Sequence, residues 1–559
     1  MATTVPAASA SATHEVTNQP PSLWPLNLFT TNRPLVEALE REGGAWAHDR
    51  AVEVGRAWGS DGIEWGFQVE EHRPVLTTHD RFGHRIDEVE FHPSWHRLMA
   101  LSREHELHSL PWTETTAERP GHVARTALYL TATQAEFGFA CPTTMTFAAV
   151  PALRAQPEIA AELEPLILST TYDGTLRPAS EKGAAVCGMA MTEKQGGSDV
   201  RSNTTTATPL NGGGPGAEYL LRGHKWFCSA PMSDLFLVLA QTEEGIGCFL
   251  VPRILPDGSR NVFRLQRLKD KLGNRSNASS EVEFDGTWGR LVGEPGRGVA
   301  TIIEMVGHTR LDCVLGSTSG MRWAVANALH HASHRSAFGK RLVDQPLMTN
   351  VLADLALESE AATALSMRLA RAYDEAHRGD EAAQRFKRLA TAVSKFYVCK
   401  RFPMLAAETL ECLGGNGYVE ASFMPRLYRE APLNSVWEGS GNVNALDVLR
   451  ALTKEPEVLQ VFFDELALAG GADARYDTFV SGLRAEFGDT EHVEVRARRI
   501  VEKMALALQG SLLLRHAPAA VSDAFCAARL GGDAGQVFGT LPPQVDARAI
   551  VDRNLPVAA

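Results

Sequence analysis

The stretch "GMAMTEKQGGSDVRSNTTTATP", residues 188–209, lies where the spacing of apolar residues along the chain changes. Before it, over residues 34–182, apolar residues recur every three to four positions, which is typical of amphipathic helices. After it, apolar residues occur in short runs that favour β-strands. The sequence therefore predicts a helical part followed by a β part, with the change at about residue 186.

The same stretch carries groups that suit a ligand. Thr192, Ser198 and Ser202 provide hydroxyls, and Gly196 and Gly197 let backbone N–H groups approach a ligand closely. This chemistry suits a flat, heteroatom-rich ring or a diphosphate, and a plain glycine turn between strands is the structural alternative. The chain has neither a P-loop nor a GxGxxG helix start, which argues against a Walker or Rossmann site.

The regions on either side give the expected fold. Short β-rich runs continue to about residue 292, and helical spacing returns at about residue 297. Four long helical segments are predicted, at residues 298–334, 344–377, 381–413 and 441–453. Helices of this length with short links favour a bundle. The apolar, Thr-rich segment 118–150 could form a buried helix.

We therefore expect a mainly α protein with a central antiparallel β domain. The expected parts are a disordered or extended arm at 1–33, a helical domain at 34–185, a β domain at 186–295, a helical bundle at 296–453 and an extra helical region at 454–559. The first residues are predicted to be disordered because they are rich in Ala, Ser, Thr and Pro.

Composition narrows the class of protein. The 559 residues carry a net charge of −12, so bulk charge gives no sign of nucleic-acid or membrane binding. The eight cysteines form no CxxC pair, which argues against zinc and disulfides and fits a reducing cytosol. No signal peptide or membrane-spanning run is recognised. We expect a cytoplasmic protein without a membrane segment or metal.

The stretch "GHKWFCSAPMSD", residues 223–234, adds aromatic residues to the predicted site. Strand alternation predicts that Trp226 and Phe227 point to opposite faces, with Ser229 on the face of Phe227. Phe227 could then stack on a ring while Ser229 donates a hydrogen bond. Ordinary core packing of both rings is the structural alternative.

Two turns between helices also suit a phosphate ligand. In "HRSAFGKRLVDQPL", residues 334–347, Arg335 and Lys340 flank a Phe-Gly turn, which is either a solvated loop or a diphosphate contact. The run "GGNG", residues 414–417, breaks a long helical segment and permits close backbone approach to a ligand.

The stretch "LNSVWEGSGNVNALDVLR", residues 433–450, contains a single acid, Glu438, between an indole and a Gly-Ser-Gly run. The next acid is Asp447, more than two helical turns further along. From the residues alone, Glu438 is either a salt-bridged or capping carboxylate, or a general base placed in apolar surroundings.

Taken together and in order, these motifs resemble the acyl-CoA dehydrogenase family: "MTEKQGGSD", "KWFCS", "R..FG", "LGGNGY" and "WEGSGN". The phrases "MTEKQGGSDVRSNTT" and "RLKDKLGNRSNASSEVEF", together with the helical region after residue 453, are most similar to the AidB branch. The resemblance implies an α–β–α architecture, an FAD cofactor and a homotetramer with FAD near the subunit interfaces.

The resemblance also implies roles for individual residues. Glu438 matches the catalytic base that removes the α-proton of an acyl-CoA thioester while hydride passes to the flavin. Arg310 lies where the family places a basic residue near substrate, although pairing with Asp312 or Glu304 is the alternative. The residues implied to contact FAD are Met191, Thr192, Gly197, Ser198, Phe227, Ser229, Arg335, Phe338, Gln345, Gly414, Gly415, Gly417, Ser440 and Asn442.

Three functions remain open from the sequence. The first is an acyl-CoA dehydrogenase, for which no motif identifies the redox partner. The second, implied by the AidB branch, is a double-stranded-DNA-binding flavoprotein of the DNA alkylation response with little acyl-CoA turnover. The third is an oligomer that keeps FAD only as a folding cofactor. For DNA, the best basic patch comprises Arg496, Arg498, Arg499 and Lys503, although residues 451–559 hold 11 basic and 15 acidic residues.

Overall fold

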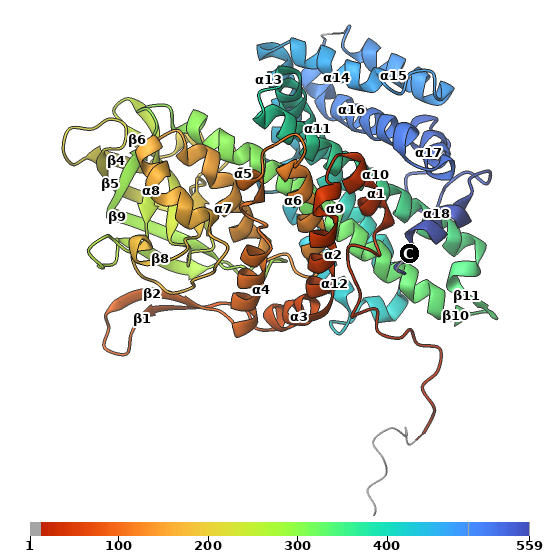
Figure 1. Ribbon diagram of the computed structural model, residues 1–559, viewed down its shortest axis with the longest axis horizontal. Coiled ribbons are helices and arrows are strands. Elements are labelled where there is room, and N and C mark those ends of the chain that lie inside the picture. The colour runs from red at the N-terminus through yellow and green to blue at the C-terminus, as the bar shows by residue number, and fades with distance from the viewer. Residues whose placement is uncertain (1–12, 490, 558–559) are drawn as a thin grey trace, which may run out of the picture.

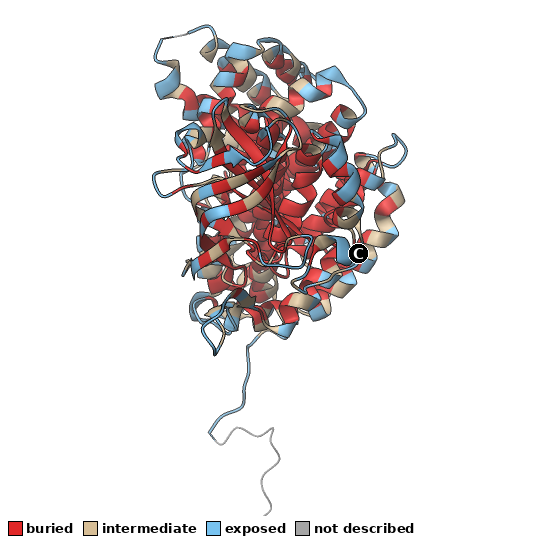
Figure 2. Ribbon diagram, turned by 90° about the vertical axis from the view of Figure 1, so that its left-hand side faces the viewer, coloured by how far each residue is buried: buried red, intermediate tan, exposed pale blue. Residues whose placement is uncertain are grey.

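A computed structural model describes residues 13–489 and 491–557, so residues 1–12 of the predicted arm lie outside the described residues. Figure 1 places a β domain at one end of the molecule, a helical bundle beside it, and further C-terminal helices along one edge of the bundle. Buried residues concentrate in the middle of the molecule, and exposed residues lie around its outside (Figure 2). This arrangement confirms the predicted mainly α fold with a central β domain and additional C-terminal helices.

The N-terminal region is helical, with one hairpin that was not predicted from the sequence. Its elements are α1 (Arg33–Arg41), α2 (His48–Ala57), α3 (Ile63–Glu71), β1 (Val75–His79), β2 (Arg85–Glu90), α4 (Pro93–Glu104), α5 (Leu110–Thr113), α6 (Gly121–Ala132), α7 (Ala140–Leu153) and α8 (Pro157–Leu168). The segment predicted as one buried helix at 118–150 forms two, α6 and α7, and almost every residue of both is buried.

The end of the predicted arm is part of the folded core. Leu28 and Phe29 are fully buried. The backbone N–H of Leu28 donates to the carbonyl of Gly55 at 3.1 Å, which fixes this segment against α2. The prediction of an arm up to residue 33 was therefore wrong for these residues, because two adjacent large apolar side chains provide enough burial to order the backbone.

The β domain is one sheet that closes on itself. Its strands are β3 (Cys187–Ala190), β4 (Thr206–Pro209), β5 (Glu218–Ser229), β6 (Leu235–Thr242), β7 (Gly245–Pro252), β8 (Phe263–Leu268) and β9 (Ser279–Val292). The order is β3-β6-β4-β5-β9-β7, and β7 also pairs with β6. Most pairs are antiparallel as predicted, but β3 and β4 each pair with β6 in parallel.

The helical bundle follows the predicted spans closely. Its elements are α9 (Gly298–His334), the hairpin β10 (Ser336–Ala337) and β11 (Lys340–Arg341), α10 (Pro346–His377), α11 (Glu381–Cys412), α12 (Phe423–Glu430) and α13 (Gly441–Lys454). Local chemistry explains the ends: α10 starts with a proline, and the Asp380 side chain accepts from the Ala383 N–H at 2.9 Å to cap α11.

The C-terminal region adds α14 (Glu457–Ala467), α15 (Ala474–Glu486), α16 (Val493–His516), α17 (Ala519–Phe525) and α18 (Ala547–Asn554). Of these, α16 packs against α10, α11 and α13, and α18 packs against α10. Short turns complete the chain: η1 (Ala45–Ala47), η2 (Trp58–Gly62), η3 (Ala179–Glu181), η4 (Val200–Ser202), η5 (Leu342–Asp344), η6 (Gly414–Gly417), η7 (Leu433–Ser435) and η8 (Cys526–Leu530).

Three chemical features can be read from the described part of the chain. All eight cysteines are buried and free, as expected for small apolar residues. Among the described residues, no helix has the length and apolar character needed to cross a bilayer. In the same residues, no group of three or more His, Cys, Asp or Glu side chains is arranged to hold a metal ion.

Candidate active site

Glu438 lies in the link between η7 and α13 with an unusual backbone. Its φ angle of +56° is in the left-handed region, which non-glycine residues rarely occupy. Three hydrogen bonds hold the link: Arg310 Nε donates to the Glu438 carbonyl at 3.0 Å, and Lys395 Nζ donates to the carbonyls of Trp437 and Gly439. Backbone held this way by its surroundings is typical of functional sites.

The Glu438 carboxylate is half-buried and has one direct donor. Thr309 Oγ1 donates to Oε2 at 2.7 Å, while Oε1 accepts no hydrogen bond from the described residues. Burial raises the pKa of Glu438, and the Thr309 hydrogen bond and the positive charges of Lys395 and Arg310 oppose that rise. A raised pKa is what we expect of a carboxylate that acts as a general base.

Arg310 is held by a partner that the sequence did not identify. Its Nη1 donates to Asp447 at 2.8 Å, while Asp312 lies in a separate buried pair with Arg125. Residues two apart on a helix do not face each other, which explains why Asp312 cannot pair with Arg310. Arg310 is therefore placed to fix the Glu438 backbone, and its predicted contact with substrate stays a prediction.

A buried carboxylate that sequence reasoning missed organises the loop after β3. Glu193 and Lys225 are both fully buried and form an ion pair at 2.8 Å. Burial alone would raise the pKa of Glu193, but hydrogen bonds from Lys225, Thr204 and Thr205 outweigh burial and lower it. The alternation of the strand around Lys225 was the available signal, because it places a lysine on the inner face.

This loop brings the predicted residues of the first motif together. A Cβ atom at Gly197 would lie 2.5 Å from Thr192 Oγ1, so only glycine allows this approach. The Thr192 carbonyl accepts from the Trp226 N–H at 2.8 Å, which joins the loop to β5. Ser198 is exposed and Met191 is half-buried at the same edge of the sheet.

The faces predicted for Trp226 and Phe227 were wrong. A register shift between Lys225 and Cys228 interrupts the alternation of β5. The Lys269 ammonium consequently lies 3.2 Å from the Trp226 ring centroid and 4.7 Å from that of Phe227, so both rings adjoin one cation. Phe227 remains 49% exposed, which leaves its ring available to a ligand.

The second group of predicted cofactor residues lies elsewhere in the chain. Arg335, Phe338 and Gln345 belong to the β10–β11 hairpin and the start of α10, at the far end of the molecule from the β domain (Figure 1). Residues Gly414, Gly415 and Gly417 form η6 on the same side, since Asn18 contacts the hairpin and Gln19 contacts Asn416. A single chain therefore does not bring the predicted cofactor residues of the β domain together with those of the hairpin and η6.

The residues after Glu438 meet the C-terminal region. Ser440 and Asn442 are exposed at the start of α13, and Arg498 of α16 donates to Asn442 Oδ1 at 3.3 Å. The other predicted DNA-binding residues, Arg496, Arg499 and Lys503, all form ion pairs with Glu486 at 2.6–3.0 Å. Their charges are thus partly neutralised within the protein.

Three family models match the chain. They describe the AidB N-terminal domain at residues 18–174, the acyl-CoA dehydrogenase middle domain at 188–287 and the acyl-CoA dehydrogenase C-terminal domain at 296–453. The Escherichia coli (strain K12) protein AidB is 45% identical over 92% of this chain and 94% of its own. Acyl-CoA dehydrogenase family member 11 of Caenorhabditis elegans is 31% identical over 71% of this chain and 65% of its own.

Solved structures show the same fold. The Bd2924 apo-form has a TM-score of 0.82 at 27% identity and covers 90% of this chain and all of its own. Caenorhabditis elegans ACDH-11 in complex with C11-CoA has a TM-score of 0.80 at 24% identity, covering 99% of this chain and 94% of its own. FAD is the cofactor of the family, in agreement with the prediction. The chain belongs to the acyl-CoA dehydrogenase family, within its AidB branch.

Proposed function

We propose that the protein is an FAD-dependent dehydrogenase of acyl-CoA thioesters, with Glu438 as the base that removes the α-proton. The observation that carries the proposal is the Glu438 carboxylate itself. Its left-handed backbone is held by Arg310 and Lys395, its Oε2 is held by Thr309, and its Oε1 is unoccupied by any described donor. Reduction of the bound flavin by acyl-CoA is the experiment that tests it.

The residues of the β domain fit an isoalloxazine ring. Thr192 and Ser229 supply hydroxyls, Ser198 is exposed, and the half-exposed ring of Phe227 offers a flat apolar surface. Gly197 permits the close packing of the loop that carries Thr192. When bound there, FAD would accept the β-hydride of the substrate.

The residues of this chain would supply positioning and proton transfer. A carboxylate of ordinary pKa is a weak base for a thioester α-proton, so the rise in pKa caused by burial improves the match. Oε1 would take the proton while Thr309 keeps the carboxylate in one orientation. Lys395 and Arg310 would hold the backbone so that this orientation is present before substrate binds.

Replacement of Thr309 by valine should move the pH dependence of flavin reduction. The Thr309 hydroxyl stabilises the charged form of Glu438, so its loss should raise the pKa of Glu438 further, by about one unit. The acidic limb of the rate profile should shift to higher pH by the same amount, because only ionised Glu438 accepts a proton. Stopped-flow reduction between pH 5 and 9 checks this, and an unchanged limb would contradict the assigned hydrogen bond.

A homotetramer is part of the proposal. Phe338, Leu347 and Tyr418 are 98%, 83% and 80% exposed, and they belong to or adjoin the hairpin and η6, whose residues the family resemblance assigns to FAD near the subunit interfaces. Large apolar side chains with this exposure favour an interface. Phe338→Asp should lower the mass measured by light scattering and weaken FAD retention, whereas an unchanged mass would argue against this interface.

The alternative function is a DNA-binding flavoprotein of the alkylation response with little acyl-CoA turnover. Similarity to AidB supports this function. The ion pairs of Glu486 count against the basic patch on α16, because they lower its net positive charge. Retardation of duplex DNA that is salt-sensitive and lost when Arg496, Arg498 and Arg499 are replaced by alanine would favour it. Retardation that survives these changes would exclude the α16 patch.

A further inference from the structure

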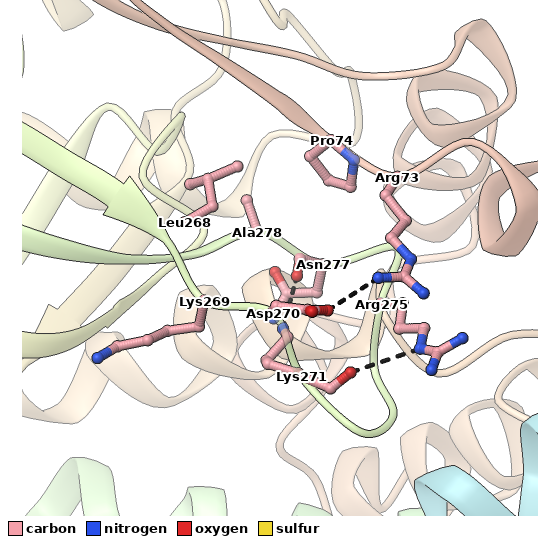
Figure 3. Close-up of a pocket in the computed structure, with 9 residues that line it drawn as sticks. All are labelled: Arg73, Pro74, Leu268, Lys269, Asp270, Lys271, Arg275, Asn277 and Ala278. Carbon is pink, nitrogen blue, oxygen red and sulfur yellow. Dashed lines mark hydrogen bonds and ion pairs between the residues drawn. The ribbon is translucent and has the colours of Figure 1, made fainter.

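A cavity of about 220 Å³ lies between the link from α3 to β1 and the loop from β8 to β9 (Figure 3). One water needs roughly 10–15 Å³ measured in the same way, so the cavity has room for a small ligand. Its wall carries four cations, Arg73, Lys269, Lys271 and Arg275, and one acid, Asp270. The lining is therefore strongly positive.

Two of these cations are neutralised within the protein. Arg73 Nη1 contacts Asp270 at 2.9 Å, and Lys269 Nζ contacts Glu281 at 2.7 Å. Figure 3 shows the Lys269 side chain extending away from the other cations. The remaining positive charge of the cavity is thus concentrated on Lys271 and Arg275.

Lys271 has no carboxylate partner among the described residues. Its Nζ donates to the Asn277 carbonyl at 2.6 Å and to Ser279 Oγ at 3.0 Å, which leaves one of its three N–H groups for a ligand. Burial lowers the pKa of Lys271 to about 8. Glu430, Glu136 and Glu70 oppose this fall in pKa only from a distance, since none of the three forms an ion pair with Lys271, so an anion in the cavity would stabilise the buried ammonium further.

Arg275 is the second cation of the cavity that has no ion-pair partner among the described residues. Within the described residues, its only hydrogen bond runs from Nε to the Lys271 carbonyl at 3.4 Å. Burial and the nearby positive charges of Arg429 and Arg73 lower the pKa of Arg275, and the negative charges of Glu70 and Glu420 oppose them only in part. Its two terminal nitrogens are therefore available to oxygen atoms of an anion.

The cavity also contains an acceptor without a partner. Asn277 is 1% exposed, and its Oδ1 has no hydrogen-bond partner although its Nδ2 donates to Asn274 Oδ1 at 3.0 Å. A buried, unsatisfied amide oxygen is uncommon in folded proteins. A ligand hydroxyl beside the anionic group would satisfy it.

We propose that this cavity binds a small molecule that carries a phosphate monoester group. Two cations without ion-pair partners match the double charge of such a group, and Asn277 Oδ1 matches a hydroxyl next to it. The site would adjoin the flavin region, because Lys271 contacts Ser279 and the Ser279 hydroxyl lies 3.2 Å from that of Ser229. Phosphate binding there does not depend on acyl-CoA turnover.

Calorimetric titration with inorganic phosphate, in a phosphate-free buffer, tests the proposal on the full chain. The wild type should bind phosphate saturably, and Lys271→Gln and Arg275→Gln should each weaken binding about tenfold, and both together about a hundredfold. Arg222→Gln is the matched control, since Arg222 is an exposed arginine of the same domain paired with Asp285. This control should bind phosphate like the wild type.

A second measurement does not depend on variants that fold. Acetic anhydride should modify Lys271 in the wild type, and phosphate should protect Lys271 while leaving exposed lysines such as Lys454 unprotected, as read by mass spectrometry. Absence of saturable phosphate binding, equal binding by the double variant, or unprotected Lys271 would each overturn the proposal. Binding of malonate in preference to phosphate would assign the site to a dicarboxylate instead and would also overturn it.

Discussion

Replacement of Glu438 by glutamine should slow flavin reduction by acyl-CoA about 10²- to 10⁴-fold and leave the fold intact. The amide keeps the size of the side chain and can still interact with Thr309, but it cannot accept the α-proton. FAD content should not change, because the Glu438 side chain is not among the predicted cofactor contacts. Anaerobic stopped-flow mixing at 450 nm measures the rate directly.

A matched control separates loss of the base from a change in charge. Glu411→Gln removes an exposed carboxylate at the end of α11 and should leave the rate unchanged. If Glu438→Gln reduces flavin as fast as the wild type, another group removes the proton and the assignment of Glu438 fails. A variant that has lost its FAD would instead show that the link also supports the cofactor.

Replacement of Asp312 by asparagine should lower the free energy of unfolding by about 3–5 kcal/mol. Asp312 and Arg125 are 2% and 1% exposed at their side chains and are joined by two hydrogen bonds of 2.6 and 2.7 Å. Thr144 Oγ1 donates to the same carboxylate at 2.6 Å. Asparagine would leave the Arg125 charge buried without a counter-charge, and urea unfolding followed by circular dichroism measures the loss.

The substitution of Asp312 should also disturb the candidate active site around Glu438, because Thr309, Arg310 and Asp312 lie within one turn of α9. Asp285→Asn is the surface control, since its pairs with Arg222 and Arg264 are exposed and should contribute less than about 1 kcal/mol. Replacing both partners by apolar residues, as Arg125→Met with Asp312→Leu, should recover most of the stability. Equal losses in the buried and surface variants would contradict the account.

Helix positions were predictable from the sequence where the apolar period was long. The helix predicted over 298–334 is α9, Gly298–His334. Helical spacing of apolar residues that continues over 37 residues is hard to reconcile with any other secondary structure. The hairpin β1–β2 was missed because its residues are mostly polar and mostly exposed, so they show little apolar alternation. Short elements with exposed faces depend on contacts that a local pattern does not encode.

In the candidate active site, too, some features could be predicted from the sequence and others could not. Glu438 could be singled out as an isolated acid among apolar residues, and the structure adds the donors that hold it. The pairing of Arg310 with Asp447 could not be predicted, because the two residues lie on different helices, α9 and α13. The faces of Trp226 and Phe227 were mispredicted because a register shift in β5 depends on pairing with β9.

Anaerobic titration of the purified, FAD-loaded wild type with a panel of short acyl-CoAs, followed by its visible spectrum, tests the central claim most directly. The account predicts that at least one acyl-CoA bleaches the flavin absorbance, and that Glu438→Gln with the same FAD content does not bleach under the same conditions. A yellow wild-type protein that no acyl-CoA reduces would contradict the proposed dehydrogenase and favour the DNA-binding alternative.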